Sequence, residues 1–217
     1  MRKAIAEKEK LVRSILRLDE RLRQVLDLSE HETLFLDLRK AYGGAEVGLF
    51  AFFFLNLIHL QKGQGIFLKS GIPHAYLKGN IVECMANSDN VVRAGLTPKF
   101  KDVETLIDIL TYDLSPVPIL GEALTRKEVI YPIPVPDFQL SRWIMERGEE
   151  RREMTGNRPE ILLITQGEAL IRWDARAEGG ERALRQGRSI LIPACLSEFQ
   201  LVAQQSAEIF KAAVPEP

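Results

Sequence analysis

Residues 160–174 have the sequence EILLITQGEALIRWD, in which two short apolar runs flank a glycine at position 167. Short apolar runs bounded by turn residues are typical of β-strands. Comparable runs occur on both sides of this stretch, at 138–146, 189–192 and 198–202, with another glycine turn at 179–180. Short strands at this spacing predict that residues 138–217 fold as a small β-sandwich or barrel.

Immediately upstream the sequence predicts a connection and a short helix. Six positions between residues 113 and 137 are proline or glycine. This composition favours an extended connection over residues 114–137. Asp102 is placed to cap a short helix over residues 103–110.

Residues 44–113 carry a second β-pattern. Residues 47–60 are mostly apolar and aromatic, and a Lys-Gly-Gln-Gly sequence at 62–65 precedes Ile-Phe-Leu at 66–68. The order predicts a strand, a turn and a second strand.

The first 43 residues are predicted to be helical. Ser29 and Glu32 match a capping box for a second helix, which Gly43-Gly44 would end. A coiled-coil surface for a partner is possible, but about four or five turns is short for one, so a packed helical subdomain over residues 1–43 is favoured. Apolar residues recur at helical spacing at Leu11, Ile15, Leu18, Leu22 and Val25.

The two β-regions share a spaced motif. Gly63, five residues and Lys69-Ser-Gly71-Ile-Pro-His74 align with Gly187, five residues and Pro193-Ala-Cys195-Leu-Ser-Glu198. The spacing is similar to the second motif of cupin barrels, Gly-x5-Pro-x-Gly-x2-His. The first copy has lysine where cupins have proline, and the second has Cys195 and Glu198 in the last two places. The repeat predicts two copies of one β-module.

Composition excludes several classes of protein. The chain has 217 residues, with 29 Lys and Arg against 30 Asp and Glu, a formal net charge of −1 and a pI ≈ 6.4. It therefore offers no global electrostatic basis for binding nucleic acid or an anionic membrane. No apolar stretch approaches the roughly 20 residues of a membrane-spanning helix, and the charged start lacks a secretory signal pattern. Two cysteines are too few for a disulfide scaffold, so the sequence predicts a cytoplasmic protein.

Most of the chemistry-bearing residues lie between Pro73 and Lys99. Polar side chains there stand among small and apolar residues, where a core normally excludes charge. Histidine is a metal-ligand type, glutamate supplies a carboxylate, and arginine and lysine suit phosphate or an enediolate. The residues concerned are His74, Tyr76, Glu83, Asp89, Arg93 and Lys99.

The same residues could instead have purely structural roles. His74 could be a hydrogen-bonded core histidine, and Glu83 with Arg93 could form a structural ion pair. Residues 87–90 could be only a loop. Cys84 is flanked by apolar residues and is expected to be an inert packed thiol.

The residues of this region resemble type I mannose-6-phosphate isomerase. The resemblance covers about residues 34–112 and continues weakly through 135–138 and 161–167 to the end. The N-terminal helices look like the end of that family's helical insertion. The matching stretches are Phe53-Phe-Leu-Asn56, Pro73-His-Ala-Tyr-Leu77, Glu83-Cys-Met-Ala86, Ser88-Asp-Asn90, Val92-Arg-Ala-Gly-Leu-Thr-Pro-Lys99 and Asp102-Val-Glu-Thr-Leu106.

The resemblance implies a fold and a set of roles. The fold would be mainly β after an N-terminal helical segment, with cupin-like barrels: a partial catalytic barrel at 44–113 and a C-terminal barrel at 138–217. The matching residues imply that His74 is a zinc ligand, that Arg93 is catalytic, and that Lys99, Tyr76 and Glu83 bind substrate.

The implied reaction interconverts mannose 6-phosphate and fructose 6-phosphate by proton transfer through an enediol, as a step toward GDP-mannose. Zinc would polarise the sugar oxygens, and a cation such as Arg93 would stabilise developing negative charge.

The chain departs from the family pattern at the metal. The family's other zinc ligands, a glutamine, a histidine and a glutamate, precede the helical insertion, and neither His31 nor His59 matches them. Catalytic zinc normally takes about three protein ligands, so the site is expected to be incomplete here. We expect the chain to be a C-terminal portion of the enzyme, with a sugar phosphate as its small-molecule partner. Two alternatives are a non-catalytic cupin-like fragment, serving as a sugar-phosphate-binding or interaction module, and an unrelated metal-free β-barrel binding protein.

Overall fold

The computed structural model describes residues 7–43, 46, 48–88, 90–111, 116–121, 126–174 and 179–215. The chain divides into two compact units, and each is described by itself. The helical unit comprises Met1–His59, Lys69–Gly79 and Asp89–Ser115. The sandwich unit comprises Leu60–Leu68, Asn80–Ser88 and Pro116–Pro217.

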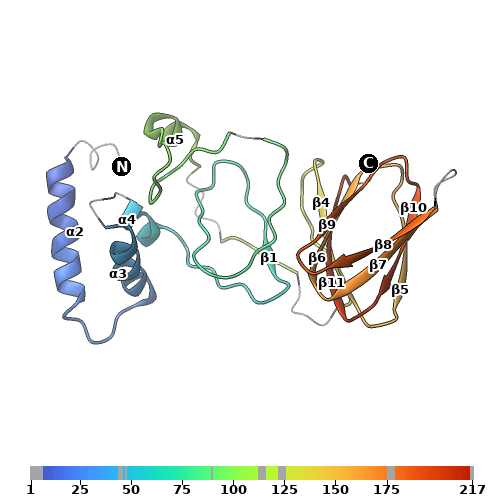
Figure 1. Cartoon of the computed structure of the whole chain (residues 1–217). Helices are drawn as coiled ribbons and strands as arrows, with labels where there is room; N and C mark the ends of the chain where they lie inside the picture. Colours follow the sequence, from blue (N-terminus) through green and yellow to red (C-terminus); the bar gives the residue numbers. More distant parts are fainter. Residues whose placement is uncertain are drawn as a thin grey trace. The chain divides into compact units, whose positions relative to one another are not determined.

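The helical unit is built around one small apolar cluster. Its elements are α2 (Lys8–Leu22), α3 (Glu30–Tyr42), α4 (Gly48–Ala51), the 3-10 helix η1 (Phe52–Phe54) and α5 (Val103–Ile109) (Figure 1). Ile15 and Leu22 of α2 are buried in one cluster with Phe35 of α3 and Leu49 of α4. The three-and-four spacing of α2 thus turns one face of the helix inward, against α3 and α4. Val25 lies beyond α2 and is exposed.

The predicted helix caps are present. The Ser29 side chain accepts a hydrogen bond from the Glu32 amide, and the Glu32 carboxylate accepts one from the Ser29 amide, which completes the capping box. Gly43, with φ 60°, follows α3. The Asp102 side chain accepts from the Thr105 amide at 3.1 Å and caps α5. Gly44 lies outside the described residues.

The strand predicted at 47–60 is wrong. Residues 48–54 form α4 and η1, residues 55–60 are irregular, and no strand occurs there before Gly65. Leu49 is fully buried, and the Phe50 and Phe53 rings lie 6.3 and 6.2 Å from the Phe35 ring. A continuous apolar run satisfies a helix and a strand equally well, and packing against α3 decides for the helix.

The sandwich unit is dominated by two antiparallel sheets (Figure 1). The four-stranded sheet has the order β5-β10-β7-β8, and the five-stranded sheet has the order β3-β4-β11-β6-β9. Buried side chains of both sheets, among them Trp143, Ile164, Ile171 and Leu201, form a single core. The strands are β3 (Glu128–Ile130), β4 (Gln139–Met145), β5 (Glu150–Met154), β6 (Glu160–Gln166), β7 (Glu168–Trp173), β8 (Gly180–Arg185), β9 (Ser189–Ile192), β10 (Glu198–Ala203) and β11 (Ala207–Ala213).

The fold class is confirmed, with one correction. The chain is mainly β after an N-terminal helical segment, and strands occupy all the runs predicted after residue 138. The sheets, however, are not closed barrels. Within the described residues no ladder joins the two sheets, so β5, β8, β3 and β9 remain edge strands. The core is closed by packing between two faces instead of by continuous hydrogen bonding.

Two short strands lie within the segment predicted as an extended connection. β2 (Ile119–Leu120) pairs with β1 (Gly65–Ile66), and β3 pairs with β4. Val129 and Tyr131 are buried. This part of the segment therefore packs on the sandwich unit in spite of its prolines, because an edge strand tolerates them nearby.

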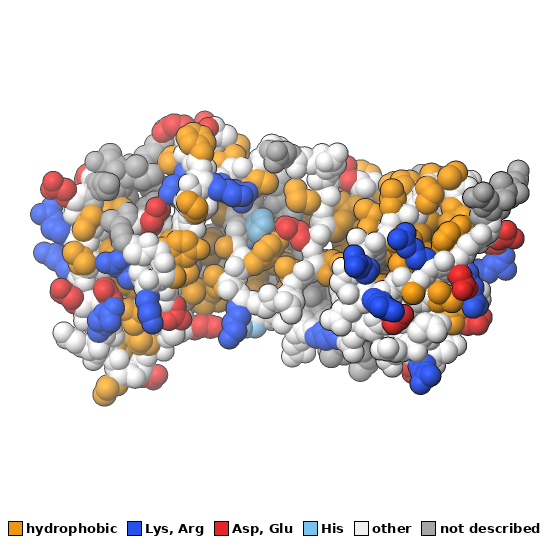
Figure 2. Space-filling model, viewed as in Figure 1, with side chains coloured by type: hydrophobic (Ala, Val, Ile, Leu, Met, Phe, Trp, Pro, Cys, Tyr) orange, Lys and Arg blue, Asp and Glu red, His pale blue; other side chains and the backbone are white. Residues whose placement is uncertain are grey.

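The outer side of the four-stranded sheet carries neighbouring opposite charges. Figure 2 shows basic and acidic side chains interspersed over these strands. Arg152 Nη2 lies 2.6 Å from Glu198 Oε2, and Arg172 Nε lies 3.1 Å from Glu181 Oε2. Glu198 is the position that aligns with His74 in the repeated motif. Its carboxylate is used in an ion pair between β5 and β10.

Candidate functional site

His74 lies on an irregular loop of the helical unit. The loop is tied down by the Thr111 amide, which donates a 2.9 Å hydrogen bond to the Gly71 carbonyl oxygen. Nδ1 of His74 lies 3.0 Å from the Ile72 carbonyl oxygen. Because a carbonyl can only accept, Nδ1 carries the hydrogen, and Nε2 of the neutral ring is left with a free lone pair. An exposed imidazole oriented in this way is suited to ligate a metal.

Tyr76, Arg93 and Lys99 are exposed side chains of the same unit. The Tyr76 ring lies 5.9 Å from the His74 ring. Neither Arg93 nor Lys99 forms an ion pair with any described residue, so both cations are available to an anionic ligand. The Lys99 amide donates to the Thr97 hydroxyl at 3.2 Å, which shapes the backbone before Lys99.

Glu83 belongs to the other compact unit of the chain. It is exposed on the Asn80–Ser88 segment, which belongs to the sandwich unit. Four of the five predicted site residues thus share one unit, and their convergence with Glu83 on one pocket stays a prediction. Next to it, burial raises the pKa of the half-buried Cys84 thiol, as expected for an unreactive cysteine.

The other two histidines are engaged by the helices. His31 Nε2 lies 3.4 Å from the Leu55 carbonyl oxygen, and its ring stacks on Phe53 at 6.2 Å. His59 Nε2 lies 2.6 Å from Glu30 Oε1 at an exposed position.

The described residues do not complete a zinc site. Among them, no group of three or more His, Cys, Asp or Glu side chains is arranged to hold a metal ion. His74 fits as one ligand, and catalytic zinc needs about three. Asp89 lies outside the described residues.

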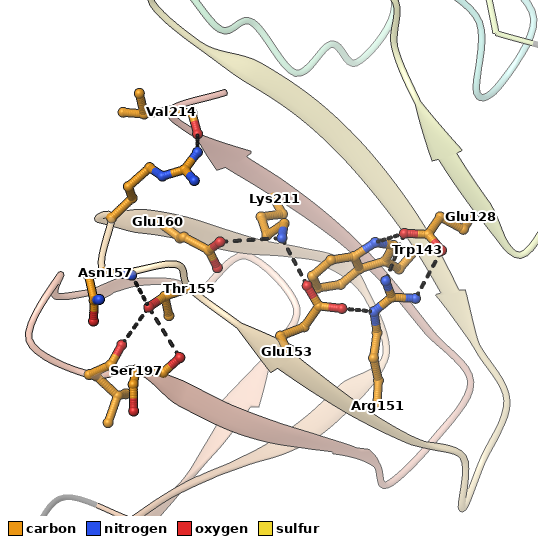
Figure 3. A network of polar contacts seen from close by, with 12 residues as sticks. Glu128, Trp143, Arg151, Glu153, Thr155, Asn157, Glu160, Ser197, Lys211 and Val214 are labelled. Atoms are coloured by element: carbon orange, nitrogen blue, oxygen red, sulfur yellow. Dashed lines mark hydrogen bonds and ion pairs between the residues drawn. The ribbon is translucent and has the colours of Figure 1, made fainter. Parts of the chain in front are cut away.

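A polar network that the sequence did not predict lies inside the sandwich (Figure 3). Lys211 is two residues beyond the buried Ile209 on β11 and so points to the same side of the sheet. Its Nζ lies 2.9 Å from Glu153 Oε2 and 3.3 Å from Glu160 Oε1. Burial raises the pKa of the Glu160 carboxyl, and the Lys211 charge opposes this effect.

The same network surrounds Trp143 of β4. The Arg151 guanidinium lies 4.1 Å from the Trp143 ring centre, and it also contacts Glu153 at 2.6 Å. Glu128 accepts from the Trp143 indole N–H at 3.1 Å and pairs with Arg151 at 2.7 Å. Charged side chains on β3, β5, β6 and β11 thus neutralise one another at this end of the interior. The network binds the two sheets together.

Comparison with known proteins gives consistent matches. Mannose-6-phosphate isomerase of Cryptococcus neoformans is 34% identical over 96% of this chain and 49% of its own length. The enzyme of Rattus norvegicus is 46% identical over 62% of this chain and 33% of its own length. No family model matches the chain. The chain thus spans at most about half the length of these curated relatives.

Solved structures agree on the fold. Phosphomannose isomerase of Salmonella typhimurium in its apo form covers 96% of this chain with a TM-score of 0.74, at 24% identity. A structure of that enzyme bound to its substrate, fructose 6-phosphate, and a zinc atom gives a TM-score of 0.73. The chain covers about half of each, at 51% and 50%.

These findings define the protein in two stages. Its helices, two facing sheets and structural matches place it among proteins with the cupin fold of phosphomannose isomerase. By sequence, it is homologous along nearly its whole length to mannose-6-phosphate isomerase, of which it spans about half. Among the described residues, no helix is both long enough and apolar enough to cross a bilayer.

Proposed function

We propose that this chain is the sugar-phosphate-binding portion of a mannose-6-phosphate isomerase, which interconverts mannose 6-phosphate and fructose 6-phosphate. The observation that carries the proposal is the 34% identity with the Cryptococcus enzyme over 96% of the chain, which includes the Pro73–Lys99 region. The relative's name is that of an isomerase of mannose 6-phosphate, and the substrate-bound structure of the Salmonella enzyme supports a sugar phosphate as ligand.

The exposed cations account for recognition of the phosphate. Lys99 carries a charge with no ion-pair partner among the described residues and would bind the phosphate group. Arg93 would stabilise the negative charge that develops as a proton moves between C1 and C2 of the sugar. Tyr76 and Glu83 would line the sugar-binding pocket.

The described residues supply only part of the expected zinc site. His74 would supply one zinc ligand through Nε2, and the remaining ligands would lie outside the described residues. We therefore assign no reaction step to zinc in this chain. A cytoplasmic location and a role in supplying GDP-mannose are part of the proposal.

Phosphate-dependent binding tests the proposal. Fructose 6-phosphate should bind the purified chain more tightly than fructose, as measured by calorimetric titration. Arg93→Met and Lys99→Met should each weaken the binding about tenfold or more, the size expected for a lost charge-assisted contact. Arg188→Met removes an exposed arginine on the sandwich unit and should leave the affinity unchanged. Equal affinity for fructose and fructose 6-phosphate would overturn the proposal.

The non-catalytic alternative is favoured by one observation, the incomplete ligand set at His74 among the described residues. Turnover and zinc stoichiometry separate the two functions. Equimolar zinc with conversion of mannose 6-phosphate would show a complete active site. Phosphate-dependent binding with neither zinc uptake nor turnover would identify a binding or interaction module.

A further inference from the structure

The two sheets of the sandwich unit are built from strands of different composition. β6 and β9 of the five-stranded sheet contain unbroken apolar runs, Ile161-Leu-Leu-Ile164 and Ile190-Leu-Ile192. β10 of the four-stranded sheet alternates instead, because Phe199 and Leu201 are buried in the core and Gln200 between them is polar. Alternation is typical of a sheet with one face in water, and unbroken apolar runs are typical of strands covered on both faces. The five-stranded sheet therefore has the composition of a sheet whose outer side is covered as well.

Apolar side chains line up across the outer side of the five-stranded sheet. Successive residues of a strand point to opposite sides, and Leu162 is buried in the core, so its neighbour Ile161 faces outward. Ile161 lies opposite Leu191 in the ladder of β6 with β9, and opposite Ala212 in the ladder of β6 with β11. β4 continues the line with Leu140, which pairs with Ala212. We term these four residues the apolar row: Leu140, Ala212, Ile161 and Leu191.

The chain itself covers one part of this outer side and leaves another part open. Arg142 lies two residues beyond Leu140 on the same side of β4 and is fully buried. Gly63 packs on it so closely that a Cβ at position 63 would overlap Arg142 Nη1. Toward the edge strand β9 this cover ends, since Ile161 is 50% exposed and Leu191 is 63% exposed. The apolar row thus continues a surface that is already in use for packing.

The relatives contain a polypeptide of the right size to cover the apolar row. The chain spans about half the length of the Cryptococcus and Salmonella enzymes. Each of these relatives carries both halves in one polypeptide. Parts of one chain that pack together bury surface against each other, and apolar side chains supply most of the free energy of that packing.

We propose that the apolar row is a docking surface for the other half of a mannose-6-phosphate isomerase, that is, for a polypeptide homologous to the part of the relatives that this chain does not match. The proposal rests on the proposed function, since this partner would complete the same enzyme. Burial of the exposed Ile161 and Leu191 side chains would drive the association, because both leave water when the partner binds.

Co-expression tests the proposal. The probe is the part of the Cryptococcus enzyme that lies outside its match to this chain, and it should co-purify with the full chain. Leu191→Lys should weaken this association about tenfold or more, because an unpaired ammonium group would be buried at the contact. Ile161→Lys gives a second variant in the same row and should have a similar effect.

Met154→Lys is the matched control. Met154 is 65% exposed on the edge strand β5, and it lies opposite Glu198 on the charged outer side of the four-stranded sheet. This variant should leave the association unchanged. In the chain alone, Leu191→Lys and Met154→Lys should both leave the midpoint of urea denaturation unchanged, because both side chains are exposed there.

Several results would overturn the proposal. Failure of the probe to co-purify, or equal association of all the variants, would show that the apolar row does not bind this partner. A dimer of the unaltered chain that Leu191→Lys dissociates, seen by analytical ultracentrifugation, would make a second copy the occupant. A lower denaturation midpoint for Leu191→Lys in the chain alone would show that the chain itself covers the row. Fructose 6-phosphate is titrated separately, so failure of the proposed function would leave the co-purification result interpretable.

Discussion

The strands of the sandwich and the stretch that carries the predicted site residues are ordered by different means. The sandwich strands share long antiparallel ladders and one apolar core. Between η1 and α5, the described residues contain a single two-residue strand, β1. His74, Tyr76, Glu83, Arg93 and Lys99 are all exposed on that stretch. The comparison teaches that stability is concentrated in the sandwich, while the residues suited to chemistry lie on irregular backbone.

The largest expected effect comes from truncating one leucine in each region. Leu162 is fully buried in the core, and Leu77, near His74, is 54% exposed. Leu162→Ala should lower the free energy of unfolding by about 2–5 kcal/mol, because it leaves a cavity. Leu77→Ala should change it by no more than about 0.5 kcal/mol. Urea denaturation measures both, and similar losses would contradict the contrast.

A second test compares a buried hydrogen bond of the sandwich unit with an exposed one of the helical unit. Thr155 is buried, and its hydroxyl donates to the Leu196 carbonyl oxygen at 2.7 Å. Thr155→Val should lower the free energy of unfolding by about 1–3 kcal/mol, because that carbonyl loses its partner away from water. Thr33 makes a similar bond to the Ser29 carbonyl at an exposed helix site. Thr33→Val is the control, and it should have little effect in the same denaturation experiment.

The helical unit should respond more modestly to loss of a cap. Ser29→Ala removes the capping box of α3 and should lower the free energy of unfolding by about 1 kcal/mol. Ser14→Ala, within α2, removes only a hydroxyl bonded to the Lys10 carbonyl. It should be neutral or slightly stabilising, since alanine favours helix. Thermal unfolding followed by circular dichroism compares the two, and equal effects would rule out a role for the cap.

The smallest effect expected is a pH dependence from Glu160. Burial raises its pKa above the usual 4.5, so the native state holds this proton more tightly than the unfolded chain. Its contribution to stability is therefore present below pH 4.5 and is lost as the pH rises through the folded pKa. Glu160→Gln should gain stability relative to the unaltered chain as the pH rises toward neutral.

Glu149 serves as the opposite control. The Glu146 amide donates to its carboxylate and lowers its pKa, so its contribution is present at neutral pH and lost on acidification. Glu149→Gln should lose stability relative to the unaltered chain as the pH rises. Denaturation curves across the pH range would show slopes of opposite sign for the two variants. Parallel curves would contradict the effect of burial on Glu160.

Local sequence patterns predict much of this fold. The Ser29–Glu32 capping box and the apolar strands β4, β6, β7, β9 and β10 follow from spacing alone. The sequence does not predict β5, because its inward side chains, Arg151 and Glu153, are charged and no apolar alternation marks it. Of the candidate site, the residue types come from the sequence, and the structure adds the orientation of the His74 ring.

The amino-acid sequence by itself determined where the apolar strands β4, β6, β7, β9 and β10 and the helix caps form, because hydrophobic period and capping depend on neighbours a few residues away. It also determined the homology to mannose-6-phosphate isomerases, through residues that match along nearly the whole chain. Only the tertiary structure decided that residues 48–54 are helical, that Lys211 meets Glu153 and Glu160, and that Arg142 lies under Gly63. Each of these depends on partners distant in sequence, whose burial together settles what a local pattern leaves open.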